Sequence, residues 1–163
     1  MLTIPKPLVL DADGLNVLQG DTAPLRGRSA PLILTPHPGE FARLVRTDVP
    51  AVLAQREELA TRFAAEHGLV LVLKGHATLV TDGLRFYRNT TGNAGMATGG
   101  TGDVLTGLIA ALVGQGLEAF AAAQLGVYLH GLAGDLARED LGEVSLIAID
   151  LLDYLPRAFQ QRG

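Results

Sequence analysis

The sequence predicts an α/β fold in which helices cover a mainly parallel β-sheet. Three runs, Pro7 to Leu10, Pro31 to Leu34 and Leu69 to Leu73, are continuously apolar, as strands covered on both faces usually are. Segments with helical spacing lie between and after these runs, and this order of elements is typical of layered α/β domains. Ligands of such sheets bind beyond the carboxyl ends of the strands, which is where the motifs described below fall.

The first half of the chain is expected to alternate between strands and helices. The second strand opens into a turn at Thr35 to Glu40, with a helical continuation over Phe41 to Val45. Residues Gly20 to Ala30 are polar and contain Gly, Pro and Arg, so they predict a surface connection. An apolar stripe from Val52 to Ala64 predicts one helix that ends at Gly68.

The second half is expected to contain a hairpin followed by helices. Asp82 and Gly83 separate two short extended runs, which is a strong hairpin signal. Two long apolar helices are predicted over roughly Gly102 to Val113 and Glu118 to Leu136. In a last helical segment, Pro156 should bend or end the helix.

Composition narrows the possible functions. The 163 residues suffice for one domain with a core, and a content of 48% apolar and 18% charged residues argues against disorder. Because the net charge is −4, no nucleic acid or membrane partner is expected, and an anionic nucleotide would be held by local backbone amides. The absence of cysteine excludes disulfides and thiolate chemistry. Since we find no signal peptide and no apolar run of membrane-spanning length, we expect a cytoplasmic protein.

The most informative stretch is Asn93 to Gly107, where a glycine-rich loop leads into a helix. Gly99, Gly100 and Gly102 permit a tight turn and a close approach of backbone N–H groups to a ligand. Free N–H groups and the positive end of the helix dipole meet at this point, so the stretch predicts a phosphate site. Asp103, in the first helical turn, suits a general base for phosphoryl transfer. The alternative is that Asp103 only caps the helix or favours its dipole.

Common ligand motifs are missing. The chain has no Gly-Lys-Ser/Thr of a P-loop, and Leu105 stands where the dinucleotide fingerprint requires glycine. The four histidines never approach zinc-ligand spacing. His67 is expected to favour a helix end, and His130 to serve packing or an oligomer surface.

Polar residues follow the first two predicted strands. Asp11 and Asp13 would share a face if the strand continued that far, and two carboxylates suit magnesium or substrate hydroxyls. The alternative is turn chemistry, with Asn16 as the cap of the next helix. His37, held between two prolines, can hydrogen-bond an amide or a ribose, and Glu40 can order magnesium-bound water. Alternatively, Glu40 is a capping-box residue and His37 has no role.

Lys74 ends the most apolar strand and precedes Gly75. The ammonium group can meet a phosphate, and the glycine permits close approach of an adenine or a ribose. A lysine that extends from a strand end into solvent is an equally good interpretation from local sequence.

Four segments together resemble the ADP/ATP-dependent NAD(P)H-hydrate dehydratases of the ribokinase-like superfamily. They occur in the family's order and spacing, and they are Leu10 to Asn16, Leu34 to Glu40, Leu73 to Thr78, and Asn93 to Gly107. The resemblance implies a ribokinase-like three-layer α/β/α sandwich. It also implies that family members carry roughly a hundred more residues before Asp11. We therefore expect residues 1–163 to be a single, partial nucleotide-binding domain whose N-terminal portion is missing.

The resemblance implies a set of site residues, to which we add those suggested by the motifs. The catalytic set is Asp103, as presumed base, with Gly100, Thr101 and Gly102. The adenine nucleotide, ADP or ATP, is assigned to Lys74, Gly75, His76, Ala77, Thr78, Asn93 and Gly102. The hydrated NADH or NADPH is assigned to His37, Asp103, Asp13 and Asn16, and Mg²⁺ to Glu40 through water.

The function implied by the resemblance is repair of hydrated NADH or NADPH, a lyase reaction driven by ADP or ATP. The ring hydroxyl is phosphorylated, and phosphate then leaves. One alternative is a small-molecule kinase of the same superfamily, acting on a sugar or a vitamin-precursor alcohol. Another is a non-catalytic nucleotide-binding fragment, whose exposed sheet edge would favour a homo-oligomer.

Overall fold

Five short strands form one mixed sheet in the computed structural model, which describes residues 4–18 and 20–161. Their spatial order follows the chain: β1 (Leu8–Leu10), β2 (Leu32–Leu34), β3 (Val70–Leu73), β4 (Leu79–Thr81) and β5 (Phe86–Arg88). The first three strands are parallel, whereas β4 is antiparallel to both β3 and β5. Four of the five strands therefore run in one direction, and the hairpin predicted around Asp82 and Gly83 is the β4–β5 pair.

The continuous apolar runs form strands because both faces of the sheet are covered. In β3, Leu71 and Leu73 belong to one buried cluster, whereas Val70 and Val72 belong to the cluster on the opposite face. Successive side chains of a strand point to opposite faces, so an uninterrupted apolar run is what a doubly covered strand requires.

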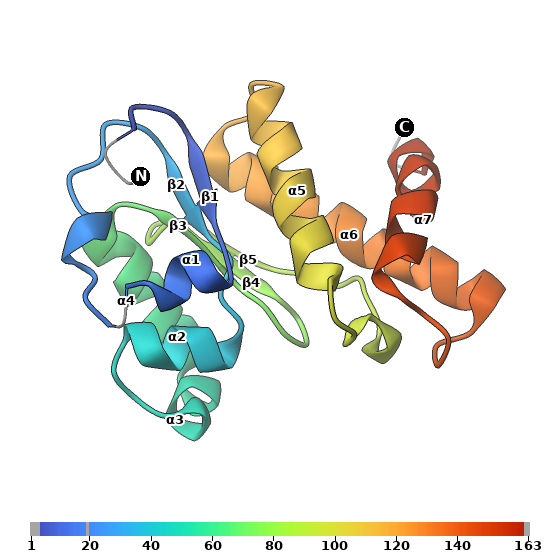
Figure 1. Cartoon of the computed structure of the whole chain (residues 1–163), viewed down its shortest axis with the longest axis horizontal. Helices are drawn as coiled ribbons and strands as arrows, with labels where there is room; N and C mark the ends of the chain where they lie inside the picture. The colour runs from blue at the N-terminus through green and yellow to red at the C-terminus, as the bar shows by residue number, and fades with distance from the viewer. Residues whose placement is uncertain (1–3, 19, 162–163) are drawn as a thin grey trace.

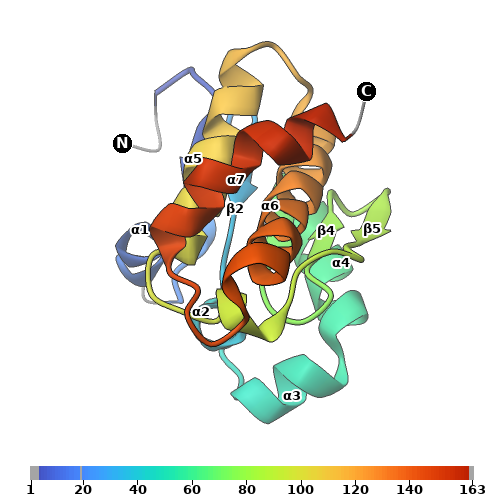
Figure 2. The same cartoon turned by 90° about the vertical axis from the view of Figure 1, so that its right-hand side faces the viewer.

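Helices complete three layers around the sheet (Figures 1 and 2). One face packs against α1 (Asp13–Asn16), α2 (Pro38–Leu44), α3 (Val49–Ala54) and α4 (Arg56–His67). The other face packs against α5 (Thr101–Gly114) and α6 (Ala119–Leu141), and α7 (Ala148–Gln160) lies on these two helices. Short 3-10 helices occur at Ala23–Leu25 and Ala94–Met96. The predicted α/β/α sandwich is confirmed.

The helix predicted from Val52 to Gly68 is instead two helices. Gln55 separates α3 from α4, because its φ of −127° and ψ of 33° leave helical geometry. The amide of Ala51 near the start of α3 is capped by the Asp48 side chain at 2.8 Å. Gly68, at φ +62°, ends α4 in the left-handed conformation, as predicted.

Two further expectations need correction. The connection over residues 20–30 is not wholly at the surface, since Leu25 is only 1% exposed and belongs to the core. Of the two effects expected of Pro156, an end of the helix is wrong, because α7 continues to Gln160; a bend at Pro156 stays a prediction. Within residues 4–18 and 20–161, no helix combines the length and apolar character needed to cross a bilayer.

Candidate active site

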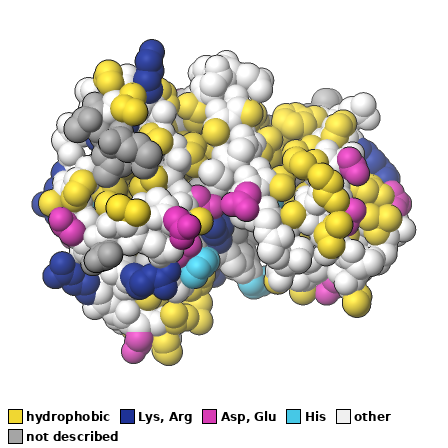
Figure 3. Space-filling view, viewed as in Figure 1, with side chains coloured by type: hydrophobic (Ala, Val, Ile, Leu, Met, Phe, Trp, Pro, Cys, Tyr) yellow, Lys and Arg dark blue, Asp and Glu magenta, His cyan; other side chains and the backbone are white. Residues whose placement is uncertain are grey.

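Polar residues gather where β1, β2 and β3 end and α5 begins. Asp11, Thr35 and Lys74 each follow one of the three strands. Backbone bonds hold these ends in register: the Thr35 amide donates to Leu10 O at 3.1 Å, and the Lys74 amide donates to Pro36 O at 2.9 Å. Figure 3 shows acidic, basic and histidine side chains around a hollow in the middle of this face.

Asp11 and Lys74 form a largely buried ion pair. The Lys74 Nζ lies 2.7 Å from Asp11 Oδ1, and the two side chains are 19% and 8% exposed, respectively. Thr106, on α5, donates to Asp11 Oδ2 at 2.8 Å, and its hydroxyl lies 3.3 Å from that of Thr35. Burial alone would raise the pKa of Asp11, but the hydrogen bond and charge of Lys74, with the Thr106 hydroxyl, hold that pKa below its usual 3.8. The carboxylate therefore stays ionised at neutral pH.

Asp11 and Asp13 do not share a strand face. The strand β1 ends at Leu10, and Asp13 is already the first residue of α1, with an exposed side chain. Asp13 Oδ1 accepts a hydrogen bond from Asn16 at 3.3 Å, and Asn16 Oδ1 accepts one from Arg43 at 2.8 Å. Asn16 is the last residue of α1 and therefore caps no following helix. The site that we predicted from two paired carboxylates is absent from this turn.

The glycine-rich loop presents the N-terminus of α5 without a side-chain cap. Gly100 occupies the N-cap position at φ +91°, where no side chain caps the helix. The Thr101 hydroxyl is turned back into the loop, where it donates to Met96 O at 2.9 Å and Thr98 O at 3.0 Å. The first-turn amides of this helix of 14 residues are thus open to an anion.

Asp103 is the third residue of α5 and is exposed. No hydrogen bond or ion pair to its carboxylate occurs within the described part of the chain, so the residue does not cap the helix. Gly102 lies directly over the buried pair, since an added Cβ would stand 3.2 Å from Lys74 Nζ and 3.8 Å from Asp11 Oδ2. The ammonium group of Lys74 therefore lies beneath the first turn that carries Asp103.

His37 and Glu40 form a capping box at the start of α2. His37 Nδ1 accepts from the amides of Gly39 at 3.0 Å and Glu40 at 3.3 Å, and Glu40 Oε2 accepts from the His37 amide at 2.8 Å. Because Nδ1 accepts, the proton of the neutral ring is on Nε2, which lies 3.5 Å from Glu40 Oε1. The His37 side chain is 52% exposed, so a ligand that binds the Nε2–H would compete with Glu40 while His37 caps the helix.

The carboxylates of the site offer little to a metal by themselves. Within the described residues, no group of three or more His, Cys, Asp or Glu side chains could hold a metal ion. The Glu40 side chain is only 6% exposed and already accepts the His37 amide. Magnesium commonly keeps several waters and uses one or two carboxylates plus substrate phosphates, so Glu40 fits it only as a water-mediated contact.

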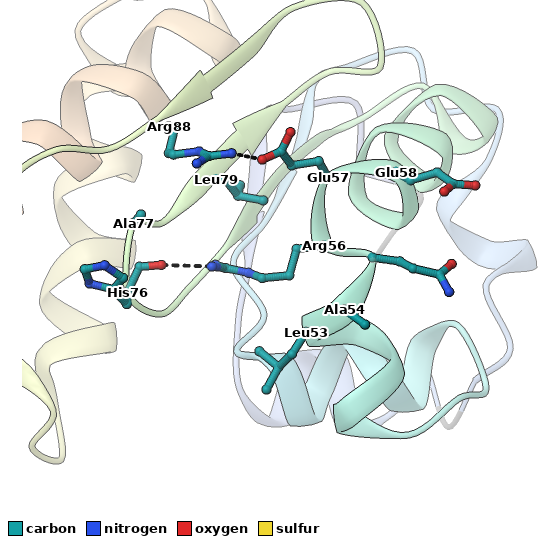
Figure 4. Close-up of a pocket in the computed structure, with 10 residues that line it drawn as sticks. Leu53, Ala54, Arg56, Glu57, Glu58, His76, Ala77, Leu79 and Arg88 are labelled. Carbon is teal, nitrogen blue, oxygen red and sulfur yellow. Dashed lines mark hydrogen bonds and ion pairs between the residues drawn. The ribbon is translucent and has the colours of Figure 1, made fainter.

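The turn after β3 forms one wall of an open pocket of about 520 Å³ (Figure 4). His76 and Ala77 line it from the turn, whereas Arg56 lines it from α4 and Arg88 from β5. Arg56 donates to the carbonyl oxygens of His76 at 2.9 Å and Leu73 at 3.4 Å.

Two residues of α6 hold the glycine-rich segment from behind. Asp135 accepts from the Asn93 side chain at 3.0 Å and from the Gly92 amide at 2.8 Å. The His130 Nε2 lies 2.9 Å from Thr101 O, and burial lowers the pKa of His130 to about 4. His130 is therefore neutral at pH 7 and donates to this carbonyl. His130 therefore packs within the protein, which is one of the two roles expected for it. Its hydrogen bond reaches the Thr101 carbonyl at the proposed anion site.

The family model described as NAD(P)H-hydrate dehydratase matches residues 1–157. The chain belongs to this NAD(P)H-hydrate dehydratase family. Its ribokinase-like fold agrees with the structures of relatives.

Three relatives of this dehydratase family illustrate the similarity. The chain is 53% identical over 152 residues to the bifunctional NAD(P)H-hydrate repair enzyme of Moorella thermoacetica, covering 92% of this chain and 28% of the relative. It is 49% identical over 140 residues to the ADP-dependent (S)-NAD(P)H-hydrate dehydratase of Neisseria meningitidis serogroup B, covering 84% and 47%. The ADP/ATP-dependent dehydratase of Bacillus subtilis, co-crystallised with ATP/Mg²⁺, superimposes with a TM-score of 0.92 at 36% identity, covering 100% and 57%. The chain thus spans less than half the length of these two curated relatives.

Sequence reasoning missed several residues that shape the candidate site. Arg56, Thr106 and Asp135 contact residues that are 20, 95 and 42 positions away, respectively. The only local signal was for Thr106, which lies one turn after Asp103 on the predicted helix. The other two side chains needed the packing of the helices against the sheet.

Proposed function

We propose that this chain supplies the nucleotide-binding and catalytic part of an enzyme that repairs hydrated NADH or NADPH at the expense of ADP or ATP. The observation that carries the proposal is the exposed Asp103 carboxylate, which has no hydrogen-bond partner in the described residues and lies at the uncapped N-terminus of α5. Membership of the dehydratase family supports the choice of substrate class.

The residues of the site suit a sequence of two chemical steps. Asp103 takes the proton of the ring hydroxyl, whose oxygen attacks the terminal phosphorus while the bond to the leaving nucleotide breaks. The amides around Gly99 to Gly102 stabilise the charge on the transferring phosphoryl group. Phosphate then leaves with the hydroxyl oxygen as the ring loses a proton from the neighbouring carbon. The substrate thereby loses the elements of water, the oxygen in the phosphate and the hydrogen as a proton, and the dihydronicotinamide is restored.

The remaining site residues bind and orient the reactants. The Lys74 to Thr78 turn and Asn93 are proposed to contact the adenine nucleotide, and His37, Asp13 and Asn16 the damaged dinucleotide. Magnesium, when bound, would offset charge on the nucleotide phosphates, with Glu40 as a contact through water.

The test is recovery of the reduced-nicotinamide absorbance from hydrated NADH with magnesium and either ADP or ATP. Wild-type protein should show recovery that depends on one nucleotide. Asp103→Asn should lose turnover by about 10²-fold or more yet retain nucleotide binding, because the base is removed and the amides remain. Asp153→Asn, an exposed residue of α7, is the matched control and should behave as wild type.

Other outcomes would favour the alternatives. A stable phosphorylated product from a sugar or a vitamin-precursor alcohol would indicate a kinase. Nucleotide binding without turnover in the wild-type chain would indicate a binding fragment, because relatives extend well beyond the matched region.

We also propose that residues 1–163 form a single partial domain, because α5 and α6 pack both on the sheet and on α7. A homo-oligomer is proposed because β1 is an edge of the described sheet. Light scattering after size-exclusion chromatography tests the oligomer, and a monomer would contradict it. A cytoplasmic location is proposed as well, and cell fractionation tests it.

A further inference from the structure

The turn from Leu73 to Thr78 has several of its carbonyl oxygens occupied, whereas three of its amides are open. Arg56 binds the carbonyls of Leu73 and His76, and the Thr78 hydroxyl donates to Gly75 O at 3.0 Å. In the described residues, the amides of Gly75, His76 and Ala77 donate no hydrogen bond. Amide donors without a protein partner are the groups that a bound phosphate or nucleotide can accept from.

The backbone of this turn is held in an unfavourable conformation. Ala77 has a φ of +49°, which is rare for a residue with a Cβ, and Gly75 has a φ of +132°. Such a conformation persists only when surrounding contacts hold it. The Thr78 hydroxyl supplies one such contact from within the turn, and the Arg56 side chain supplies two from outside it.

Arg56 is well placed for this task. It is the first residue of α4, directly after the break at Gln55, and its guanidinium reaches from the helix to the His76 carbonyl (Figure 4). The planar fork of an arginine can donate to two carbonyls at a fixed separation, which a lysine cannot do. The neighbouring Arg88 is ion-paired with Glu57, so it does not compete for the carbonyls.

The opposite flank of the turn faces the proposed phosphate site. Lys74 begins the turn, and its Nζ lies beneath Gly102 at the start of α5. The turn is thus anchored by Asp11 through Lys74 at one end and by Arg56 along its carbonyls.

We propose that Arg56 is a positioning residue that holds the Lys74 to Thr78 turn with its amides available to the adenine nucleotide. The inference rests on the proposed function, since it takes this turn to be the nucleotide-binding segment. Arg56 itself touches only the carbonyl side of the turn and need not contact the nucleotide.

The test compares Arg56→Ala, Arg56→Lys and, as a control, Arg62→Ala. Arg62 is an exposed arginine on the same helix, with no hydrogen bond or ion pair to the described residues. Calorimetry with ADP and ATP measures affinity. Amide hydrogen exchange of the free protein reports on the two bonded amides that hold the turn, those of Lys74 and Asn89, which donate to Pro36 O and Thr78 O at 2.9 Å each. Steady-state assays separate the KM for the nucleotide from kcat.

Arg56→Ala should raise the Kd and the KM for the nucleotide about tenfold, as expected when contacts worth one or two hydrogen bonds are lost. Its kcat at saturating nucleotide should stay within about twofold of wild type, and exchange of the Lys74 and Asn89 amides should become faster. The Kd, the KM and the exchange rate of Arg56→Lys should lie between those of wild type and Arg56→Ala, because a lysine can donate to one of the two carbonyls. Arg62→Ala should match wild type in all four measurements.

The inference is overturned if Arg56→Ala binds nucleotide as tightly as wild type with unchanged exchange at the turn. It is also overturned if Arg62→Ala weakens binding equally, because the effect would then be one of general charge. Should Arg56→Ala fail to fold, a folded Arg56→Lys with wild-type affinity and exchange has the same meaning. If wild-type protein binds no adenine nucleotide, the proposed function itself fails, whichever residue stands at position 56.

Discussion

Asp11→Asn provides the most direct test of the buried pair beneath the α5 N-terminus. The substitution keeps the size of the side chain but removes the charge that faces Lys74 Nζ at 2.7 Å. Lys74, only 19% exposed, would be left with an ammonium group that neither bulk water nor a carboxylate compensates.

The expected loss follows from this burial. Removal of one partner of a fully buried ion pair costs about 3–5 kcal/mol, and an exposed pair is worth about 0–1 kcal/mol. For a pair whose side chains are 8% and 19% exposed, we expect a loss of about 2 kcal/mol in the free energy of unfolding at pH 7. In a domain of this size that corresponds to a fall in Tm of roughly 4–8 °C.

The loss should depend on pH in a defined direction. The pKa of Asp11 in the folded protein lies below its usual 3.8, so the unfolded chain binds more protons in the acid range. The stabilisation is therefore fully present above pH 3.8 and is lost as the pH falls through the folded-state pKa. The difference in the free energy of unfolding between wild type and Asp11→Asn should therefore shrink as the pH falls below 3.8.

Urea unfolding at a series of pH values measures both effects. Asp13→Asn is the matched control, because Asp13 is two positions away, exposed and unpaired with any cation in the described residues. The reasoning is refuted if the two variants are equally stable at neutral pH, or if the difference in their stability does not shrink as the pH falls below 3.8.

Three further outcomes are expected. Gly107→Ala should stabilise α5 by about 0.5–1 kcal/mol, because nothing lies within 4 Å of an added Cβ. Gly102→Ala should show no such gain in stability, because its Cβ would stand 3.2 Å from Lys74 Nζ. For the same reason, Gly102→Ala should bind nucleotide more weakly. Urea unfolding measures the stability of the two variants, and calorimetry measures their affinity for the nucleotide. Equal stability and equal affinity of the two variants would contradict the expectation. The unfolding free energy of wild type should fall by up to roughly 3 kcal/mol as the pH drops from 6.5 to about 4, since the unfolded state protonates His130 and the folded state does not. His130→Gln should flatten that part of the curve in urea titrations, and an unaltered slope would contradict the assignment. Gly131→Ala should cost about 1–3 kcal/mol in the free energy of unfolding, because its Cβ would overlap Thr91, with 2.7 Å to the Thr91 carbonyl oxygen. A Tm close to that of wild type would contradict this expectation, because it would show that the contact between α6 and this loop can relax.

Much of the local structure could be predicted because it depends on neighbours in the chain. The apolar runs that form β2 and β3 are buried on both faces, and the glycine-rich loop places Asp103 in the first turn of a helix. Helix-start chemistry acts over three or four residues, so Glu40 could be expected as a capping-box residue, and this is confirmed. The alternative that gave His37 no role is wrong, because its side chain is the N-cap partner of Glu40. The function of these residues as ligands stays a prediction.

Other local interpretations could not be decided from the sequence. Whether Asp11 and Asp13 share a face depends on where β1 ends, and the strand stops at Leu10 as the chain turns into α1. The break at Gln55 is equally hidden, because the apolar stripe continues through both α3 and α4. An apolar pattern reports which residues are buried and not whether the helix axis changes direction.

The sequence by itself determined the layered fold, the family and the position of Asp103 at a helix N-terminus. Only the tertiary structure paired Lys74 with Asp11 across 63 positions, brought Arg56 to the carbonyls of the turn after β3, and set Asp135 behind Asn93. Local elements follow from rules that act within one or two helical turns. The partners of a buried charge are set instead by which strands lie side by side and which helices cover them, and that arrangement exists only once the whole chain has packed.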